Sequence, residues 1–224
     1  MPAFEYVTVE VTPFQQNCTI LWETASRRAA VIDPGGDAER IFAAIERLGV
    51  RVETILLTHG HLDHAGGAAG LREMLSRADA AAGPPPIEGP DRRDGFLLDG
   101  IELQAAQFGL GGMRNVRPDR WLAEGERVRV GEQAFEVLHC PGHTPGHIAF
   151  VSAEARFAIV GDVLFRGSVG RTDFPYGDHR RLLRSIREKL LPLGDDVEFI
   201  CGHGPGSSIG AERRSNPFLR SGAD

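Results

Sequence analysis

The chain has 224 residues, which is enough for one domain with a substantial hydrophobic core and short for two ordinary ones. Its 42% hydrophobic and 25% charged residues exclude a disordered or fibrous protein. A formal net charge of −6 argues against a nucleic-acid partner, because a surface that binds nucleic acid normally carries a basic stripe.

Targeting signals and disulfide bonds are not expected either. The first seven residues lack the basic start and apolar run of a secretory signal, and no stretch reaches the apolar length that spans a bilayer. The three cysteines, Cys18, Cys140 and Cys201, are scattered and form no CxxC pair. We therefore expect a cytoplasmic protein without a membrane partner.

Apolar runs rich in β-branched residues predict nine strands. In chain order they cover residues 6–11, 18–22, 29–32, 54–57, 126–130, 135–138, 148–151, 157–160 and 197–200. Helical periodicity covers residues 38–48, 66–76 and 179–190, with a short last helix at 209–214 that Pro217 should stop. Because strands precede single helices in both halves, the predicted class is mixed α/β.

Two intervening segments are predicted to be irregular. Residues 78–90, rich in alanine and proline, predict a loop or an edge strand. Residues 109–118, punctuated by glycine, predict an ordinary surface loop, with a flexible rim over a site as the alternative.

A faint repeat links the two halves. One strand ends at Asp33 and is followed by a helix and a second strand, which leads to His59 and His61. Another strand ends at Asp162 and is followed in the same way by a helix, a strand and His203. Two such units facing each other would bring both sets of strand ends to one edge, although chance similarity is the alternative.

The strongest chemical signal is the run Thr58-His-Gly-His-Leu-Asp-His64, which places four metal-ligating side chains within six residues. In an extended stretch His59 and His61 point the same way, because side-chain direction repeats every two residues. Asp63 and His64 stand where the chain turns into a helix, so they can approach a metal from a second direction.

Three further candidates stand at the ends of strands: His143, Asp162 and His203. A single aspartate or histidine in such a place is more often structural than ligating. Together with the first cluster, however, they gather where open sheets place their ligand sites.

Seven ligands exceed the four that one tetrahedral ion takes, so their number predicts two ions. His59, His61 and His143 would hold one ion, and Asp63, His64 and His203 the other. Asp162 would bridge them, leaving room for a bridging hydroxide between ions about 3.5–4 Å apart. Since no thiolate is needed, we expect two divalent ions, zinc first, with iron and manganese also compatible.

These motifs resemble the metallo-β-lactamase superfamily: THGHLDH at 58–64, HTPGH at 143–147, GD at 161–162 and GHG at 202–204. The resemblance covers nearly the whole chain. It implies an α/β fold, an αββα sandwich of two mixed β-sheets flanked by helices, formed by residues 1–224 as a single domain. It also implies the same division of the metal ligands.

Within the superfamily the chain looks like the glyoxalase II (hydroxyacylglutathione hydrolase) branch in its short, YcbL-like form. The residues that carry this resemblance are 14–18, 31–36, 161–175 and the tail with Gly202-His-Gly-Pro205, Glu212-Arg213 and Asn216-Pro-Phe218. The branch implies hydrolysis of a glutathione-derived thioester, S-lactoylglutathione above all, by attack of metal-bridging hydroxide on the carbonyl. Asp63 and Asp162 are then the catalytic carboxylates beside that metal-bound hydroxide.

The chain differs from the long glyoxalase II enzymes in the residues available to bind glutathione. Long glyoxalase II enzymes carry a C-terminal helical domain with basic residues, whereas only about 20 residues follow His203 here. Arg171 stands where the long enzymes place a glutathione-contacting lysine, so it is the candidate for binding the substrate carboxylate. The alternative is that Arg171 simply pairs with Asp173.

Two more residues are expected to support the centre without binding metal. His147 would orient a ligand, and Asp33 would hydrogen-bond loop backbone near the metals, with helix capping as its alternative.

Other functions remain open at this point. The first alternative is a persulfide dioxygenase, which the chain resembles at Gly170-Arg-Thr-Asp-Phe174 and which uses one iron at positions matching His59 or its neighbours, His143 and Asp162. Another hydrolase of the superfamily, or a non-catalytic metal-binding module, ranks lower.

Overall fold

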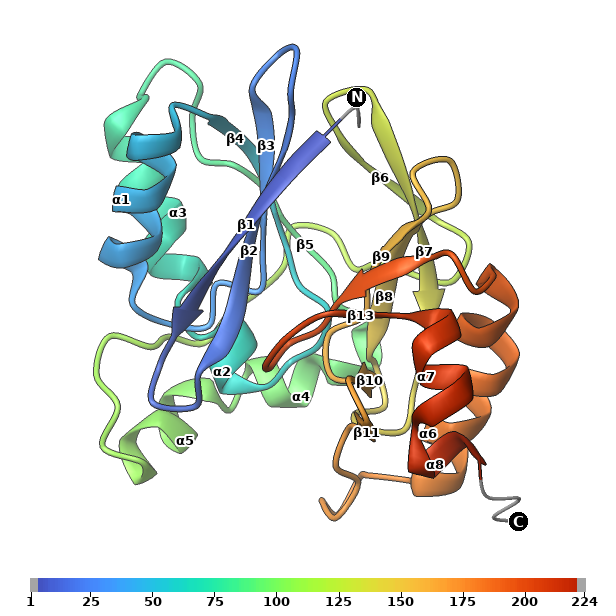
Figure 1. Cartoon of the computed structure of the whole chain (residues 1–224). Coiled ribbons are helices and arrows are strands. Elements are labelled where there is room, and N and C mark those ends of the chain that lie inside the picture. The colour runs from blue at the N-terminus through green and yellow to red at the C-terminus, as the bar shows by residue number, and fades with distance from the viewer. Residues whose placement is uncertain (1–3, 221–224) are drawn as a thin grey trace.

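Two β-sheets stack face to face in this computed structural model, which describes residues 4–220, and helices cover both outer faces (Figure 1). The first sheet has the strand order β1-β2-β3-β4-β5. Its strands are β1 Phe4–Val11, β2 Gln16–Glu23, β3 Arg28–Ile32, β4 Arg51–Leu56 and β5 Ile87–Glu88. The ends of the predicted domain, residues 1–3 and 221–224, lie outside the described residues.

The second sheet has the order β13-β12-β9-β8-β7-β6. Its strands are β6 Arg127–Val130, β7 Gln133–His139, β8 Ile148–Ser152, β9 Phe157–Ile159, β12 Glu198–Ile200 and β13 Ser207–Ser208. Both sheets are mixed, because β3 is parallel to β4 and β9 is parallel to β12, whereas β1 with β2 and β7 with β8 are antiparallel. The predicted αββα sandwich is therefore confirmed.

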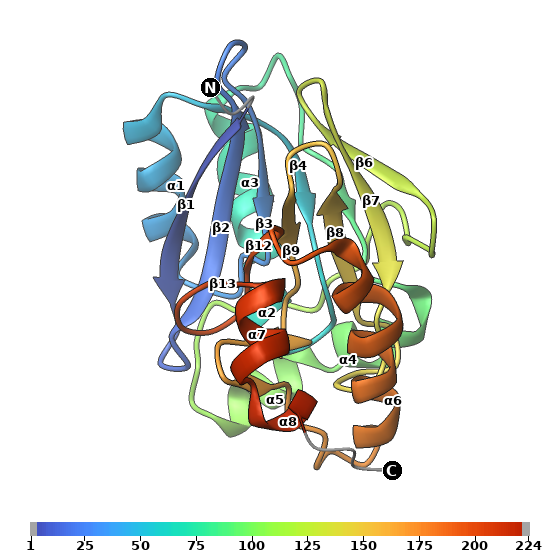
Figure 2. The same ribbon diagram turned by 45° about the vertical axis from the view of Figure 1, so that its right-hand side comes forward.

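The helices divide between the two outer faces and one edge, as the two views show together (Figures 1 and 2). Helices α1 Ala38–Leu48 and α3 Ala68–Ala78 pack outside the first sheet. Outside the second sheet lie α6 His179–Ser185, α7 Ile209–Ser215 and α8 Pro217–Arg220. Helix α6 continues as a π-helix over Ile186–Leu190 and then as a short 3₁₀ turn at Leu191–Leu193. At the edge below both sheets lie α2 Leu62–Ala65, the 3₁₀ turn Arg92–Asp94, α4 Gly95–Leu98, α5 Ile101–Gln107 and the small hairpin of β10 Leu164–Phe165 and β11 Ser168–Val169.

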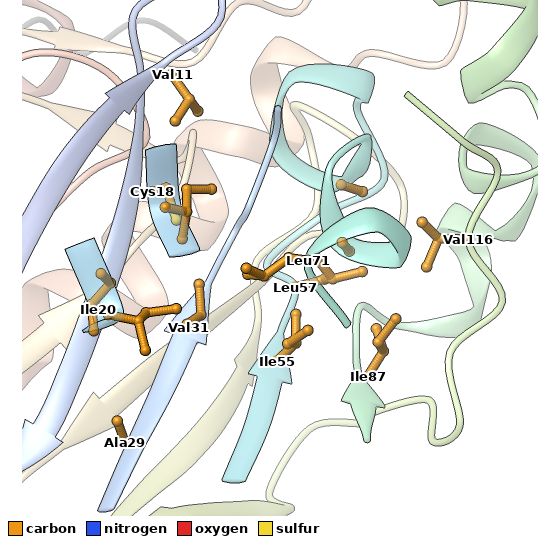
Figure 3. Packing of buried hydrophobic residues seen from close by; sticks show 14 of the residues in the cluster. Val11, Cys18, Ile20, Ala29, Val31, Ile55, Leu57, Leu71, Ile87 and Val116 are labelled. Carbon is orange, nitrogen blue, oxygen red and sulfur yellow. The ribbon is translucent and has the colours of Figure 1, made fainter. Parts of the chain in front are cut away.

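Alternation along the strands produces three packed layers of apolar side chains. In β3, Ala29 and Val31 face α1 and α3, whereas Ala30 and Ile32 face the other sheet. In β9, Phe157 and Ile159 face the first sheet and Ala158 faces the outer helices. Figure 3 shows part of the first layer, in which Ile20, Val31, Ile55 and Leu57 belong to the same cluster as Leu71 of α3. The central strands β3 and β9 are thus apolar on both faces, which leaves polar groups to gather at the strand ends.

All nine predicted strands are present, and helix 38–48 has the bounds of α1. After Ala78, the last residue of α3, residues 79–90 form a loop with the edge strand β5, and residues 109–118 have neither helix nor strand. Helices α4 and α5 were not predicted, since each is too short to repeat a periodic pattern.

The expected stop at Pro217 is correct for α7, which ends at Ser215, but Pro217 then begins α8. Its fixed φ suits the first turn of a helix, where no backbone N–H is required. None of the helices within residues 4–220 combines the length and apolar character needed to cross a membrane.

Candidate metal centre

All seven predicted metal ligands lie together at the edge where the parallel strands end. His59 and His61 follow β4, and Asp63 and His64 lie in α2 just beyond. His143 lies in the loop between β7 and β8, Asp162 follows β9, and His203 follows β12. The faint repeat in the sequence therefore corresponds to two strand–helix–strand units, β3-α1-β4 and β9-α6-β12, whose polar ends meet.

One group consists of His59, His61 and His143, all buried. Nδ1 of His61 lies 3.1 Å from Nε2 of His59 and 3.0 Å from Nε2 of His143. A tetrahedral ion that binds imidazole at 2.0–2.1 Å separates its donors by about 3.3 Å. Three ring nitrogens converging at this spacing have the geometry of a metal site.

A second group consists of Asp63, His64 and His203. Oδ2 of Asp63 lies 3.4 Å from Nε2 of His203 and 4.0 Å from Nε2 of His64. Here two nitrogens and a carboxylate face one another, a mixed donor set that zinc, iron and manganese accept.

Asp162 stands between the two groups. Its Oδ2 lies 3.6 Å from Nε2 of His143 and 3.5 Å from Nε2 of His203, and its Oδ1 lies 3.4 Å from Nε2 of His64. One carboxylate therefore faces donors of both groups, which is the position of a bridging ligand.

The nitrogen that faces away from the centre has a partner in every one of the five histidines. For His59 the partner is the Thr58 hydroxyl, at 3.1 Å, and for His64 it is the Asp33 carboxylate, at 2.9 Å. His143 donates to the carbonyl of Arg171, His203 donates to the carbonyl of Phe14, and His61 contacts the Tyr176 hydroxyl. Such outer contacts fix the orientation of each ring and direct its inner nitrogen towards the centre.

Burial and neighbouring charge set the protonation of the centre. Burial lowers the pKa of His61 to about 3, and nearby His143 adds to the shift. Burial alone would raise the pKa of Asp162, but the charge of His64 and the hydrogen bond from His203 hold that pKa well below its usual value. Burial likewise acts to lower the pKa of His203, yet its contacts with Asp162 and Asp63 outweigh it and raise the pKa to about 9.

Two buried atoms fit a cation directly. Nε2 of His64 and Oδ1 of Asp162 have no hydrogen-bond partner among the described residues, although both are buried. Leaving such groups unpaired is costly, whereas a divalent ion would accept a lone pair from each. The residues present therefore fit metal ions, and the cluster of histidines and aspartates is able to bind them.

A third group that could hold a metal contains Asp33, His59 and His64. The Asp33 carboxylate already accepts from the backbone and the hydroxyl of Thr58, at 2.7 and 2.6 Å, and contacts the outward nitrogen of His64. We therefore assign Asp33 to support of the centre, in line with the expectation that it bonds loop backbone.

His147 also lies just behind the ligands. Its Nε2 accepts from the backbone N–H of Asp162 at 3.0 Å, and its ring stacks on His59 with centroids 4.6 Å apart. His147 thus holds the strand end that carries Asp162, and it belongs to neither of the two ligand groups.

The chain approaches itself closely at Gly202. A Cβ atom added there would lie 2.0 Å from Oδ1 of Asp162 and 2.5 Å from Cε1 of His64. Only glycine therefore lets the loop after β12 pass close enough to bring His203 to the other ligands.

Sequence reasoning missed Asp94, which joins two ligand loops. This buried carboxylate accepts from the backbone N–H of Gly60 and Gly146, at 2.9 and 2.5 Å, and from the Thr144 hydroxyl at 2.6 Å. Burial raises its pKa to about 6, and these hydrogen bonds oppose the shift. No motif in the sequence surrounds Asp94, so only the fold reveals its role.

The sequence also did not predict a separate role for Asn17 at the metal centre. Its side chain donates to the carbonyls of Cys201 and Gly204, at 3.0 and 2.8 Å, and so clamps the loop that carries His203. Asn17 does lie within residues 14–18, which carry part of the family resemblance.

A pocket of about 420 Å³ opens in front of the ligands, within the size range of small-molecule sites. Its wall includes five aromatic side chains: Phe14, Phe108, Phe165, Phe174 and Tyr176. Arg171 also lines it, pairs with Asp173 through Nε and Nη2 at 2.9 Å, and stacks over Phe174. Both readings of Arg171 are thus compatible with its position, because pairing with Asp173 leaves it on the pocket wall.

Comparisons with known proteins show the family of the chain. A model of the metallo-β-lactamase superfamily matches residues 11–203. A Haemophilus influenzae protein named hydroxyacylglutathione hydrolase GloC is 49% identical over 214 residues, covering 95% of this chain and 97% of its own length. A Bacillus subtilis protein named probable metallo-hydrolase YqgX is 35% identical, covering 93% of this chain and 94% of that one.

Solved structures of the superfamily share the fold of this chain. The BLEG-1 B3 metallo-β-lactamase superposes with a TM-score of 0.85 at 32% identity, covering 97% of this chain and all of that one. The protein TTHA1623, in a di-iron-bound form, superposes with a TM-score of 0.82 at 38% identity, covering 95% of this chain and all of that one.

Proposed function

The chain belongs to the metallo-β-lactamase superfamily, and on that premise we propose that it is a dinuclear metal-dependent thioester hydrolase. Its proposed substrate is S-lactoylglutathione or a related hydroxyacylglutathione. The observation that carries the proposal is the placement of Asp162 between two three-residue ligand groups. The similarity to the GloC protein of H. influenzae supports the substrate class.

The division of labour among the residues follows from the contacts. His59, His61 and His143 would hold one divalent ion, and Asp63, His64 and His203 the other, with Asp162 shared. Ions bound there would lower the pKa of a water molecule towards neutrality and polarise a substrate carbonyl. Zinc, iron and manganese all suit the donor set.

The two carboxylates remain ionised at neutral pH. Burial would raise the pKa of Asp63, but His64 and His203 lower it, and the pKa of Asp162 is lowered still further. Asp63 and Asp162 can therefore accept hydrogen bonds from an attacking water and hold it towards the pocket.

The pocket wall suits a substrate with a charged end and an apolar stretch. The bonds to Asp173 use Nε and Nη2 of Arg171, so the hydrogens on Nη1 can bind a carboxylate such as those of glutathione. Phe14, Phe108 and Phe165 offer apolar contact to the remainder. These contacts support the substrate-binding role of Arg171 that the family resemblance implies.

Turnover of S-lactoylglutathione tests the proposal. We expect the purified protein to hydrolyse it, to lose activity with a chelator, and to regain activity with zinc, iron or manganese. Asp162→Ala should abolish turnover, while Asp99→Ala, an exposed aspartate at the end of α4, should not change it. Oxygen uptake on glutathione persulfide with a single bound iron, and no thioester hydrolysis, would instead identify a persulfide dioxygenase.

A further inference from the structure

The Tyr176 hydroxyl lies 2.8 Å from Nε2 of His61, the one ligand histidine that turns Nδ1 towards the centre. Nδ1 can bind a metal ion only through its lone pair, so the hydrogen of the neutral ring must then stand on Nε2. That hydrogen needs an acceptor, and the oxygen of Tyr176 is in place to accept it.

Tyr176 differs from the other outer partners in what it can do. The carbonyls of Arg171 and Phe14 and the carboxylate of Asp33 are acceptors only. The Thr58 hydroxyl is committed, because it donates to Oδ2 of Asp33 at 2.6 Å. Tyr176 alone among the five outer partners has a hydrogen left to donate once it has accepted from its histidine.

The backbone fixes Tyr176 in this position. Residues 174–177 form a turn, in which the N–H of Gly177 donates to the carbonyl of Phe174 at 2.9 Å. Pro175 occupies the second position of the turn, where proline is favoured. The next residue, Asp178, donates its N–H to the carbonyl of Gly142 at 2.8 Å. The turn is thereby attached to the loop that carries His143.

Aromatic contacts hold the ring itself. Tyr176 stacks on Phe174 with centroids 5.3 Å apart and planes at 12°, and it meets the edge of Phe96 at 5.3 Å. The half-buried ring also lines the pocket beside Arg171. A rigid ring with a spare hydroxyl hydrogen at a pocket wall is suited to recognise an acceptor oxygen on a substrate.

We propose that Tyr176 positions His61 for metal binding and donates its own hydroxyl hydrogen to an oxygen on the acyl group of the substrate. The second part rests on the proposed thioesterase function. It makes Tyr176 a specificity residue that favours 2-hydroxyacyl thioesters over acyl thioesters without the 2-hydroxyl group.

Tyr176→Phe tests both parts, because it removes the hydroxyl and keeps the stacked ring. The matched control is Tyr6→Phe, which changes the only other tyrosine of the chain, an exposed residue of β1 in the first sheet. Zinc affinity is measured on metal-free protein by competition with a chromophoric chelator. We expect Tyr176→Phe to bind zinc about 10-fold more weakly, as is typical when an outer partner of a ligand histidine is lost, and Tyr6→Phe to match the parent protein.

The substrate part is measured as the ratio of kcat/KM for lactoylglutathione to that for propionylglutathione, which differ only in the 2-hydroxyl group. We expect this ratio to fall about 10-fold in Tyr176→Phe, the scale of one lost hydrogen bond in a specificity pocket. An unchanged ratio with weakened zinc binding would overturn the substrate contact and leave only the positioning role.

Unchanged zinc affinity in Tyr176→Phe would overturn the positioning role. The zinc measurement needs no substrate, so it stays decisive if the parent protein hydrolyses neither thioester. That last result would refute the proposed function and, with it, the substrate part of the inference.

Discussion

Each histidine ring of the candidate centre is held by the nitrogen that faces outward, and the five outer partners come from five different residues. Thr58 and Asp33 lie behind the first sheet's ligands, whereas the carbonyls of Phe14 and Arg171 belong to loops far away in sequence. The motif spacing predicts which residues meet the metal. The motif spacing does not predict that the backbone carbonyls of Arg171 and Phe14 are partners, because every residue type has a backbone carbonyl.

Metal uptake should depend on pH through His203. Its pKa of about 9 lies above the ordinary 6.5, so the ring of the metal-free protein is protonated at pH 7. Nε2 must lose that proton to bind a metal ion. We expect zinc affinity to rise between pH 6.5 and 8. We also expect zinc binding at pH 7 to release protons. Calorimetry in buffers of different ionisation enthalpy measures both the affinity and the number of protons released.

The stability of the metal-free fold should change with pH in the direction opposite to zinc affinity. A raised histidine pKa stabilises the folded chain below pH 6.5, and this contribution is lost as the pH rises through about 9. The variant His203→Gln, which cannot titrate, should lack this part of the pH dependence of unfolding. Zinc affinity that is flat with pH in the parent protein would contradict the assignment of His203 as a ligand.

Asp94 should be important for stability because three donors depend on it. In Asp94→Ala the backbone N–H groups of Gly60 and Gly146 and the Thr144 hydroxyl lose their acceptor in a buried place. We expect the free energy of unfolding in urea to fall by about 3 kcal/mol or more. Asp99→Ala, an exposed neighbour, should stay within about 0.5 kcal/mol of the parent, and equal losses in both variants would refute the role of Asp94.

At the scale of elements, regular patterns in the sequence give regular structure. Helix α1 has its predicted bounds because Ile41 and Ile45 recur at helical spacing and Gly49 ends it in the left-handed conformation. The short helices α4 and α5 were not predicted, since a stretch of one or two turns contains too few positions to show a period. Their place below the sheets depends on contacts with α2, which are tertiary.

The loop after β12 offers a test at this scale. Gly202→Ala would force a methyl group into Asp162 and His64, so the loop must move and take His203 with it. We expect the variant to fold but to bind fewer than two ions per chain, measured by elemental analysis after dialysis. Gly111→Ala, where an added Cβ meets nothing within 4 Å, is the matched control. Two tightly held ions in Gly202→Ala would show that this close approach is not required.

For the whole molecule, the family resemblance predicts two stacked sheets, and the polar residues at the strand ends predict the edge that carries the centre. The pocket wall was not predictable in the same way. Phe14, Phe108, Phe165 and Phe174 come from four separate segments, and an isolated aromatic residue in a loop looks the same whether it packs or lines a pocket. Sequence periodicity says nothing about which loops meet.

Metal ions should also join the two halves of the molecule. His59, His61, Asp63 and His64 follow the first sheet, whereas His143, Asp162 and His203 belong to the second. Removing metal with a chelator should therefore lower the melting temperature, and adding zinc back should restore it. Free zinc at 1,000 times its dissociation constant would contribute about 4 kcal/mol. Equal melting temperatures with and without metal would contradict a centre shared between the halves.

Anomalous diffraction from crystals of the zinc-loaded protein tests the dinuclear centre most directly. We predict two zinc peaks about 3.5–4 Å apart. One should lie among His59, His61 and His143, the other among Asp63, His64 and His203, with Asp162 in contact with both. A single peak, or peaks away from these seven side chains, would contradict the account.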